Sequence, residues 1–192
     1  SFARIIESVA IARKLGDRPT FIHTVSDENI GNVRAVISFA RSMKTLMVLN
    51  PCFEYPGAEG LPRENARRLI DLSRGKGVVA DRGYLAFAAD GGNKTARPRC
   101  LAVSSTIVIS PDNRLLLPCY HRGITSIPLT AGLNVALDSP ERAAAQAGEG
   151  RYSFCEGCAI YCYIRASLIR KPDVYFLPSV ISGLKYLFER RR

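Results

Sequence analysis

The sequence lacks several features that would define its class at once. None of its apolar runs reaches the roughly 18 to 20 residues that a membrane-spanning helix needs, and the first residues carry no signal-peptide pattern. Charged residues make up 23% of the 192 residues and apolar residues 47%, so a disordered chain is not expected. We find no internal repeat and no low-complexity segment. These absences predict a globular, cytoplasmic protein with one sizeable core, or with one core and a small appendage.

Cysteine is scarce in the first half of the chain and concentrated in the second half. Cys52 stands alone, and the other five are Cys100, Cys119, Cys155, Cys158 and Cys162. A secreted disulfide scaffold is short and rich in cysteine throughout, so this distribution favours a metal site in a reducing compartment. Thiolates are soft ligands that select zinc, Cu(I) or iron–sulfur clusters. We therefore predict one metal centre built from the five clustered cysteines.

The first half of the sequence alternates between helical and strand patterns. Helices are predicted over residues 2–15, over 33–43 and from Pro62 onward, and strands over 19–25, 45–49 and 77–80. The run at 45–49 is almost continuously apolar, which is typical of a buried parallel strand. This rhythm predicts an α/β fold in which helices cover a parallel sheet, amounting to a few units of a βα barrel.

The pattern changes after Cys100. Residues 102–110 are strongly strand-forming, 111–113 form a turn of Pro, Asp and Asn, and 114–120 form a second strand, which together predict a β-hairpin. A helix is expected from Tyr163 to Ile169, after the last cysteines. The basic tail from Val180 to Arg192 has the apolar spacing of a helix, and the commoner role for such a tail is a solvated terminal helix.

The predicted hairpin raises a question about Cys100. A turn at Asp112 and Asn113 places Thr106 opposite Cys119, and Cys100 lies about 20 Å further along a straight strand. The segment 100–105 must therefore bend back for Cys100 to reach the other thiols. If it does not, Cys162 becomes the replacement ligand.

The cysteine spacing leaves more than one metal open. Structural zinc sites commonly use two C-x₂₋₄-C pairs; Cys155 and Cys158 form such a pair, whereas Cys100 and Cys119 do not. This spacing favours an iron–sulfur cluster over zinc. Buried, unpaired cysteines without a metal are the third alternative, and five of six cysteines in this arrangement are hard to explain by packing alone.

Two segments resemble the auxiliary-cluster domain of radical S-adenosylmethionine enzymes. They are CLAVSSTIVISPDNRLLLPC from Cys100 to Cys119, and CEGCAIYC from Cys155 to Cys162. In that family a cysteine precedes a hairpin with an Asp-Gly turn, Pro-Cys ends the second strand, and a C-x-x-C pair follows. Asp112 and Asn113 stand at the turn here, with one residue more than usual before Cys119. With five candidate ligands the chain is similar to the shorter Twitch form, with one [4Fe–4S] cluster, rather than to the two-cluster SPASM form.

The first half is similar to the later part of a radical S-adenosylmethionine barrel, through the runs TFIHTVSDENIGNVRAVISFA (20–40) and TLMVLNPCFEYPG (45–57). The resemblance implies a partial barrel over 1–96, an auxiliary-cluster domain over 97–170 and a basic helical tail over 171–192. The family's C-x-x-x-C-x-x-C motif, which binds the cluster that cleaves S-adenosylmethionine, is absent. The resemblance therefore implies the C-terminal portion of an oxidoreductase or maturase that is inactive alone.

The resemblance also implies partners. They are the missing N-terminal half of the barrel, a reductant such as ferredoxin or flavodoxin, and a substrate that the sequence does not reveal. S-adenosylmethionine would be bound only in the full-length enzyme. Because the active sites of βα barrels lie at the carboxyl ends of strands, Val25, Ser26 and Asn50 are expected at the edge of the cofactor pocket. Ordinary capping and loop chemistry is the alternative at these positions.

Two histidines and two arginines are further candidates. His23 shares a strand face with Phe21 and Val25, so it would line the barrel interior or be a core residue. His121 follows Cys119 closely enough to tune a cluster by hydrogen bonding. Arg97 and Arg99 flank Cys100 and would offset the negative charge of a cluster.

The net charge of +10 favours anionic partners. No recognition motif accompanies this charge, so a direct nucleic-acid role is not expected. The alternative function that we keep is a zinc-stabilised basic module that binds nucleic acid or an acidic peptide. A third alternative is a structural domain that its cysteines stabilise without a redox function.

Overall fold

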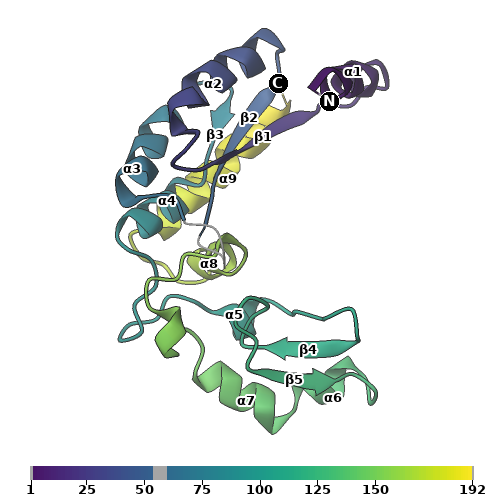
Figure 1. Ribbon diagram of the computed structural model, residues 1–192, viewed down its shortest axis with the longest axis vertical. Coiled ribbons are helices and arrows are strands. Elements are labelled where there is room, and N and C mark those ends of the chain that lie inside the picture. Colours follow the sequence, from purple (N-terminus) through teal and green to yellow (C-terminus); the bar gives the residue numbers. More distant parts are fainter. Residues whose placement is uncertain (1, 54–59, 192) are drawn as a thin grey trace.

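A computed structural model of the chain describes residues 2–53 and 60–191 and shows two parts stacked along the long axis (Figure 1). One part contains a three-stranded parallel sheet with its helices. The other contains a two-stranded antiparallel sheet, short helices and the loops that carry most cysteines. The predicted α/β class is confirmed. The parallel sheet is open and forms no closed barrel within the described residues.

The parallel sheet has the order β1-β2-β3. Its strands are β1 (Thr20–Val25), β2 (Leu46–Pro51) and β3 (Val78–Val79), each at a predicted position. Helix α1 (Phe2–Lys14) precedes β1, while η1 (Ile30–Asn32) with α2 (Val33–Ser42), and then α3 (Arg63–Leu72), form the two crossovers. Residues 54–57, the end of the run at 45–57, lie outside the described residues.

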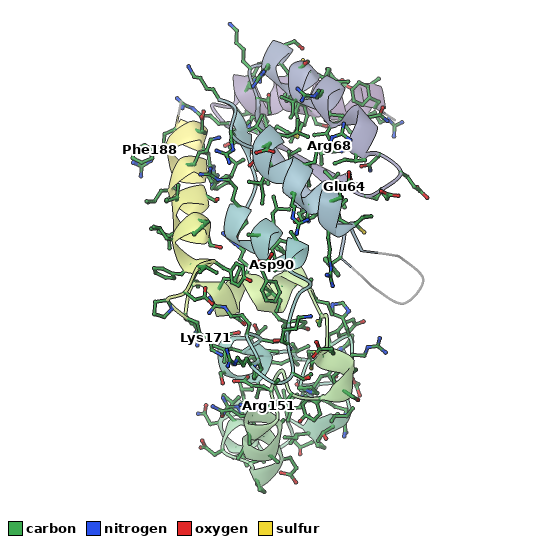
Figure 2. All side chains as sticks on the ribbon, turned by 90° about the vertical axis from the view of Figure 1, so that its left-hand side faces the viewer. Glu64, Arg68, Asp90, Arg151, Lys171 and Phe188 are labelled. Atoms are coloured by element: carbon green, nitrogen blue, oxygen red, sulfur yellow. The ribbon has the colours of Figure 1, made fainter. Side chains whose placement is uncertain are left out.

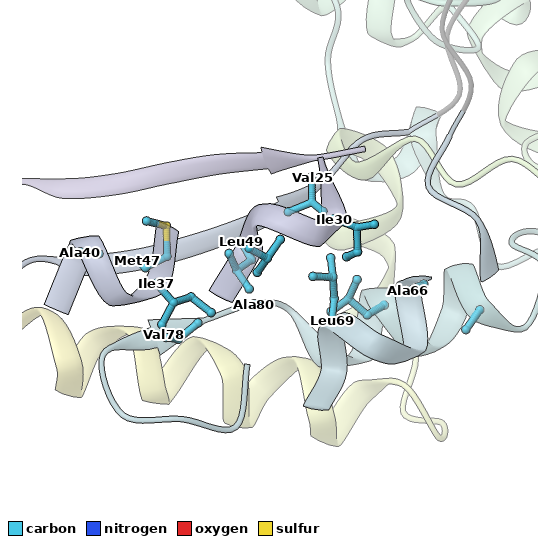
Figure 3. Close-up of a cluster of buried hydrophobic side chains, with 13 residues drawn as sticks. Val25, Ile30, Ile37, Ala40, Met47, Leu49, Ala66, Leu69, Val78 and Ala80 are labelled. Atoms are coloured by element: carbon cyan, nitrogen blue, oxygen red, sulfur yellow. The ribbon is translucent and has the colours of Figure 1, made fainter. Parts of the chain in front are cut away.

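One face of this sheet packs against α2 and α3 (Figure 3). Val25, Met47 and Leu49 project from the strands into a buried cluster that includes Ile37 and Leu69 from the helices. Full burial of such a side chain contributes about 1.5–3 kcal/mol, so this cluster holds the helices on the strands. The opposite face is more open, because β1 alternates and leaves Ile22 71% exposed.

Helices α4 (Arg82–Ala89) and α9 (Phe176–Arg191) extend the first part beyond β3. The sequence pattern had predicted no helix at α4. Helix α9 begins four residues earlier than predicted and carries Pro178 in its first turn, where a missing N–H costs little. Instead of forming a separate tail, α9 packs on α4 through Ser179, whose hydroxyl donates to Asp81 Oδ1 at 2.7 Å.

The second part begins with a correction to the predicted hairpin. Residues 102–105 form helix α5 (Ala102–Ser105), so the segment after Cys100 bends back, as the cysteine geometry required. Strand β4 (Arg114–Leu117) pairs with β5 (Thr125–Pro128), and the predicted partner strand contributes only a bridge between Ile109 and Leu115.

Helical segments complete the second part and return the chain to α9. They are α6 (Leu133–Leu137), α7 (Pro140–Ala147), η2 (Ser153–Cys155) and α8 (Tyr161–Leu168). Ser139 caps α7 by accepting from Arg142 N. The helix predicted from Tyr163 to Ile169 is thereby confirmed. In the described part of the chain, no helix is both long and apolar enough to cross a membrane.

The contact between α4 and α9 depends on Gly83. A Cβ at Gly83 would lie 2.2 Å from both Ser179 Oγ and Tyr175 O, whereas a Cβ at Gly183 would meet nothing within 4 Å. We expect Gly83→Ala to lower the free energy of unfolding by about 1–3 kcal/mol through overpacking. The matched control Gly183→Ala should be neutral or stabilising by up to about 1 kcal/mol, because alanine favours a helix. Urea denaturation followed by circular dichroism measures both, and equal values would contradict this account of the contact.

Candidate metal centre

The five clustered cysteines come from three segments of the second part, at Cys100, at Cys119 and over 155–162. Cys100 precedes α5, Cys119 follows β4, Cys155 ends η2, Cys158 lies in the next loop and Cys162 is in the first turn of α8. Four of these thiols converge. The pKa of Cys100 is influenced by Cys158, Cys155 and Cys119, and the pKa of Cys155 by Cys158 and Cys119.

Cys162 occupies a different environment from the other four. Its side chain is exposed, whereas Cys100 and Cys155 are buried and Cys119 and Cys158 are half-buried. Because the bend at α5 brings Cys100 to the convergent group, Cys162 is not needed as its replacement. The ligand role of each cysteine stays a prediction.

Burial disfavours the charged form of three of the convergent thiols in the metal-free chain. It raises the pKa of Cys100 to about 12 and that of Cys155 to about 11, and it also raises the pKa of Cys119. Desolvation disfavours the thiolate, and neighbouring thiolates would repel one another. A bound cation reverses this preference, since a coordinating thiol is deprotonated outright.

Backbone amides around three of the sulfurs favour the thiolate. Backbone hydrogen bonds that lower the thiol pKa come from Ala102 for Cys100, from Arg122 and His121 for Cys119, and from Tyr152 and Gly150 for Cys155. The exposed Arg122 adds a positive charge near Cys119. Hydrogen bonds to sulfur are among the features that set the potential of an iron–sulfur cluster. The local environment is therefore suited to stabilise sulfur that carries negative charge.

Asn93 ties together the segments that carry these cysteines. Its fully buried side chain donates from Nδ2 to Gly150 O at 2.8 Å and to Cys155 O at 3.0 Å. Its Oδ1 accepts from Arg99 N at 2.8 Å and from Cys100 N at 3.0 Å. One amide thus joins the loop of Cys100 to the loop of Cys155.

The backbone of Asn93 extends this link to Cys158. Asn93 N donates to Cys158 O at 2.9 Å, and Asn93 O accepts from Gly157 N at 2.8 Å. Gly92 permits the close approach, because a Cβ there would lie 2.3 Å from Gly157 O. Asn93 was not among the residues singled out from the sequence, and the run Gly91-Gly92-Asn93 was the available signal.

A second buried side chain shapes the loop of Cys100. Glu149 Oε2 accepts from Val103 N and Ser104 N at 2.9 Å each, and its Oε1 accepts from Ser104 Oγ at 2.6 Å. A carboxylate at the first turn of a helix satisfies free amides and favours the helix dipole. This contact explains why a segment with strong strand preference forms α5 instead.

Aromatic side chains surround the site and connect it to the first part. Tyr84 and Tyr163 are buried in the same cluster as Cys100, together with the partly buried Phe53. The ring of His121 lies 6.0 Å from the rings of both Phe53 and Tyr163, and burial lowers the His121 pKa. These rings limit the access of water, while the predicted tuning role of His121 stays a prediction.

The contacts of Arg99 differ from the role expected from the sequence, in which it would offset the negative charge of a cluster. Its guanidinium forms an ion pair with Asp173, donates to Lys171 O at 2.7 Å and lies 5.8 Å above the Tyr175 ring. Arg99 therefore anchors the link between α8 and α9. Arg97 is exposed.

The residues predicted to border the cofactor pocket at the strand ends lie in different environments. Val25 is fully buried in the helix-facing core, and its carbonyl accepts from Cys52 N at 2.7 Å, so its contribution is structural. His23 lies on that same face of β1 and not on the open face. Ser26 begins the turn into η1, and Asn50 lies opposite Thr24 in the sheet, on the more open face.

The described residues offer no ready site for a single metal ion. No three His, Cys, Asp or Glu side chains among residues 2–53 and 60–191 are grouped in a way that could hold one.

Searches of protein-family models, curated proteins and solved structures found no match for the chain.

Asn93 should be essential to the arrangement of the cysteines. Asn93→Ala removes the partners of two buried N–H groups and two buried carbonyls, and each unsatisfied group costs about 1–3 kcal/mol. We expect a loss of at least about 3 kcal/mol in the free energy of unfolding of the metal-free chain. Asn134→Ala, at an exposed position in α6, is the control and should change stability little. Near-equal stability of the two variants would remove Asn93 from its central role.

Proposed function

We propose that the chain is the C-terminal portion of a radical S-adenosylmethionine oxidoreductase or maturase and binds one auxiliary [4Fe–4S] cluster. Its ligands would be Cys100, Cys119, Cys155 and Cys158. The observation that carries the proposal is the convergence of these four thiols from three separated segments, at a site where backbone amides favour charged sulfur.

The residues present fit such a cluster better than a single zinc ion. Four soft thiolates are the usual ligand set of a [4Fe–4S] cluster, but they are also that of structural zinc. A zinc ion with Zn–S bonds of about 2.3 Å needs its sulfurs about 3.8 Å apart. A cluster gives each thiolate its own iron and so accommodates sulfurs that are further apart. Among residues 2–53 and 60–191, no group of His, Cys, Asp or Glu side chains that could hold a single ion is found.

The protein residues around the thiols have separate tasks. A bound cluster would supply one-electron chemistry, for electron transfer or for substrate positioning. The amides at His121 and Arg122, with the Arg122 charge, would stabilise the reduced, more negative state and raise its potential. Tyr84 and Tyr163 would limit solvent access.

The first part of the chain supports a role within a larger barrel. Ile22, Thr24 and Asn50 lie on a face that α2 and α3 leave uncovered, where the inner residues of a barrel would stand. In the full enzyme, Ser26 and Asn50 would border the S-adenosylmethionine pocket. The partners would be the N-terminal half of the barrel and a reductant such as ferredoxin or flavodoxin, acting in the cytoplasm, where thiols remain reduced.

One observation favours the alternative of a basic binding module. A groove of about 430 Å³ between α2 and α3 is lined by Arg34, Arg41 and Arg68, and by Asp71. Guanidinium groups recognise phosphates and carboxylates. In this alternative the cysteines would bind zinc, and the groove would bind nucleic acid or an acidic peptide.

Metal analysis of anaerobically reconstituted protein separates these functions. We expect a brown protein with about four iron and four sulfide per chain, bleached by dithionite. The single variants Cys100→Ala, Cys119→Ala, Cys155→Ala and Cys158→Ala should each lose most of the visible absorbance. Cys162→Ala and Cys52→Ala are the matched controls and should retain it.

Two results would contradict the proposal. A colourless protein with one zinc and no iron after reconstitution would favour the binding module. Loss of the cluster in Cys162→Ala, with retention in Cys100→Ala, would replace one proposed ligand by the other.

A further inference from the structure

Helix α9 buries polar residues and exposes apolar ones, which is the reverse of an ordinary surface helix. Its buried residues are Ser179 and Ser182, whereas five of its large apolar side chains are exposed. The exposed fractions are 61% for Leu177, 42% for Ile181, 50% for Leu184, 53% for Leu187 and 67% for Phe188. A surface helix of a globular protein usually buries its apolar stripe and exposes its polar face.

Specific hydrogen bonds hold α9 in this orientation. Ser179 Oγ donates to Asp81 Oδ1 at 2.7 Å, and Ser182 Oγ accepts from Arg82 N at 3.1 Å. Lys185 Nζ donates to the carbonyl oxygens of Ser73 and Gly75 at 2.8 and 2.7 Å. Rotation of the helix to bury its leucines would break all of these contacts.

The exposed apolar residues form one continuous stripe. Leu177, Ile181, Leu184 and Phe188 are spaced by four, three and four residues, which places them on one side of the helix. Figure 2 shows Phe188 on the side of α9 that faces away from the rest of the chain. We call these four residues the α9 stripe.

Positive charge accompanies the α9 stripe at its C-terminal end. Arg190 and Arg191 are exposed, and the guanidinium of Arg18 donates to Arg191 O. This contact brings the loop after α1, with Leu15 77% exposed, toward the same end of the molecule (Figure 1). Apolar side chains and cations therefore share one end of the protein.

We propose that the α9 stripe and the cations at its C-terminal end dock the protein on an anionic membrane surface. An apolar face bordered by arginine is the composition that binds at the boundary between headgroups and acyl chains. Anionic lipids attract such cations. The helix would lie in the interface without crossing the bilayer. A second copy of the chain is the less favourable occupant, because two chains of net charge +10 repel each other.

Flotation with lipid vesicles tests this proposal. The full chain should float with vesicles of phosphatidylcholine and phosphatidylglycerol, and several-fold less with phosphatidylcholine alone. The double variant Leu184→Ser with Phe188→Ser should bind the anionic vesicles at least about tenfold more weakly, since each buried methylene contributes to partitioning. The matched control is Ile107→Ser with Ile124→Ser, which alters two residues of similar exposure, 51% and 60%, in the other part of the chain; it should bind like the unaltered protein.

The charge contribution has its own variants. Arg190→Gln with Arg191→Gln should weaken binding about tenfold and reduce its sensitivity to salt. Arg97→Gln with Arg151→Gln removes the same charge from exposed positions elsewhere and should have a much smaller effect. Circular dichroism confirms that each variant is folded.

Three results would overturn the membrane proposal. The first is failure of the full chain to float with anionic vesicles. The second is equal binding by the α9 variants and their controls. The third is a dimer, detected by light scattering, that becomes a monomer when Leu184 and Phe188 are substituted. The α9 stripe would then be an interface between two copies of the chain. These readouts do not depend on a bound cluster, so the proposal stands or falls separately from the proposed function.

Discussion

The buried amide of Asn93 is the interaction on which the cysteine site depends. Its two donors and its acceptor are used by backbone groups of Gly150, Cys155, Arg99 and Cys100. These partners come from two segments, 99–100 and 150–155, that lie at least 50 residues apart in sequence. A buried polar group is favourable only when it is satisfied, so this set of bonds specifies one relative position of the two loops.

The cysteine site balances two opposing electrostatic effects. Burial raises the pKa of Cys100, Cys119 and Cys155 and disfavours their thiolates in the metal-free chain, which limits repulsion among them. Backbone amides at three of the thiols favour negative charge, as does Arg122 at Cys119. The amides are held in place by the loops that Asn93 and Glu149 join, so charged sulfur at these positions would be stabilised with little rearrangement.

The two parts of the chain are joined mainly through buried side chains and α9. Tyr84 of α4 is packed in the same cluster as Cys100 and Ile164, and Phe53 reaches this cluster from the end of β2. Arg99 fixes the segment between α8 and α9 through Asp173. The cysteine loops are therefore anchored on the helices that follow the parallel sheet. The face of β1 with Ile22 and the α9 stripe are apolar surfaces that stay open on this framework.

Local pattern in the sequence determined the strands of the parallel sheet and most of its helices. Apolar spacing and end signals such as Pro62 act over a few residues, so they can be recognised without knowledge of distant contacts. The grouping of the cysteines and the need for a bend between Cys100 and Thr106 also followed from sequence spacing and strand geometry. Tertiary structure alone decided that the bend is helix α5, because Glu149 lies more than 40 residues away and overrides the strand preference of that segment. Tertiary structure also decided the pairing of β4 with β5, the role of Asn93, the contact of Arg99 with Asp173 and the outward apolar face of α9. Each of these features depends on partners that only the folded chain brings together.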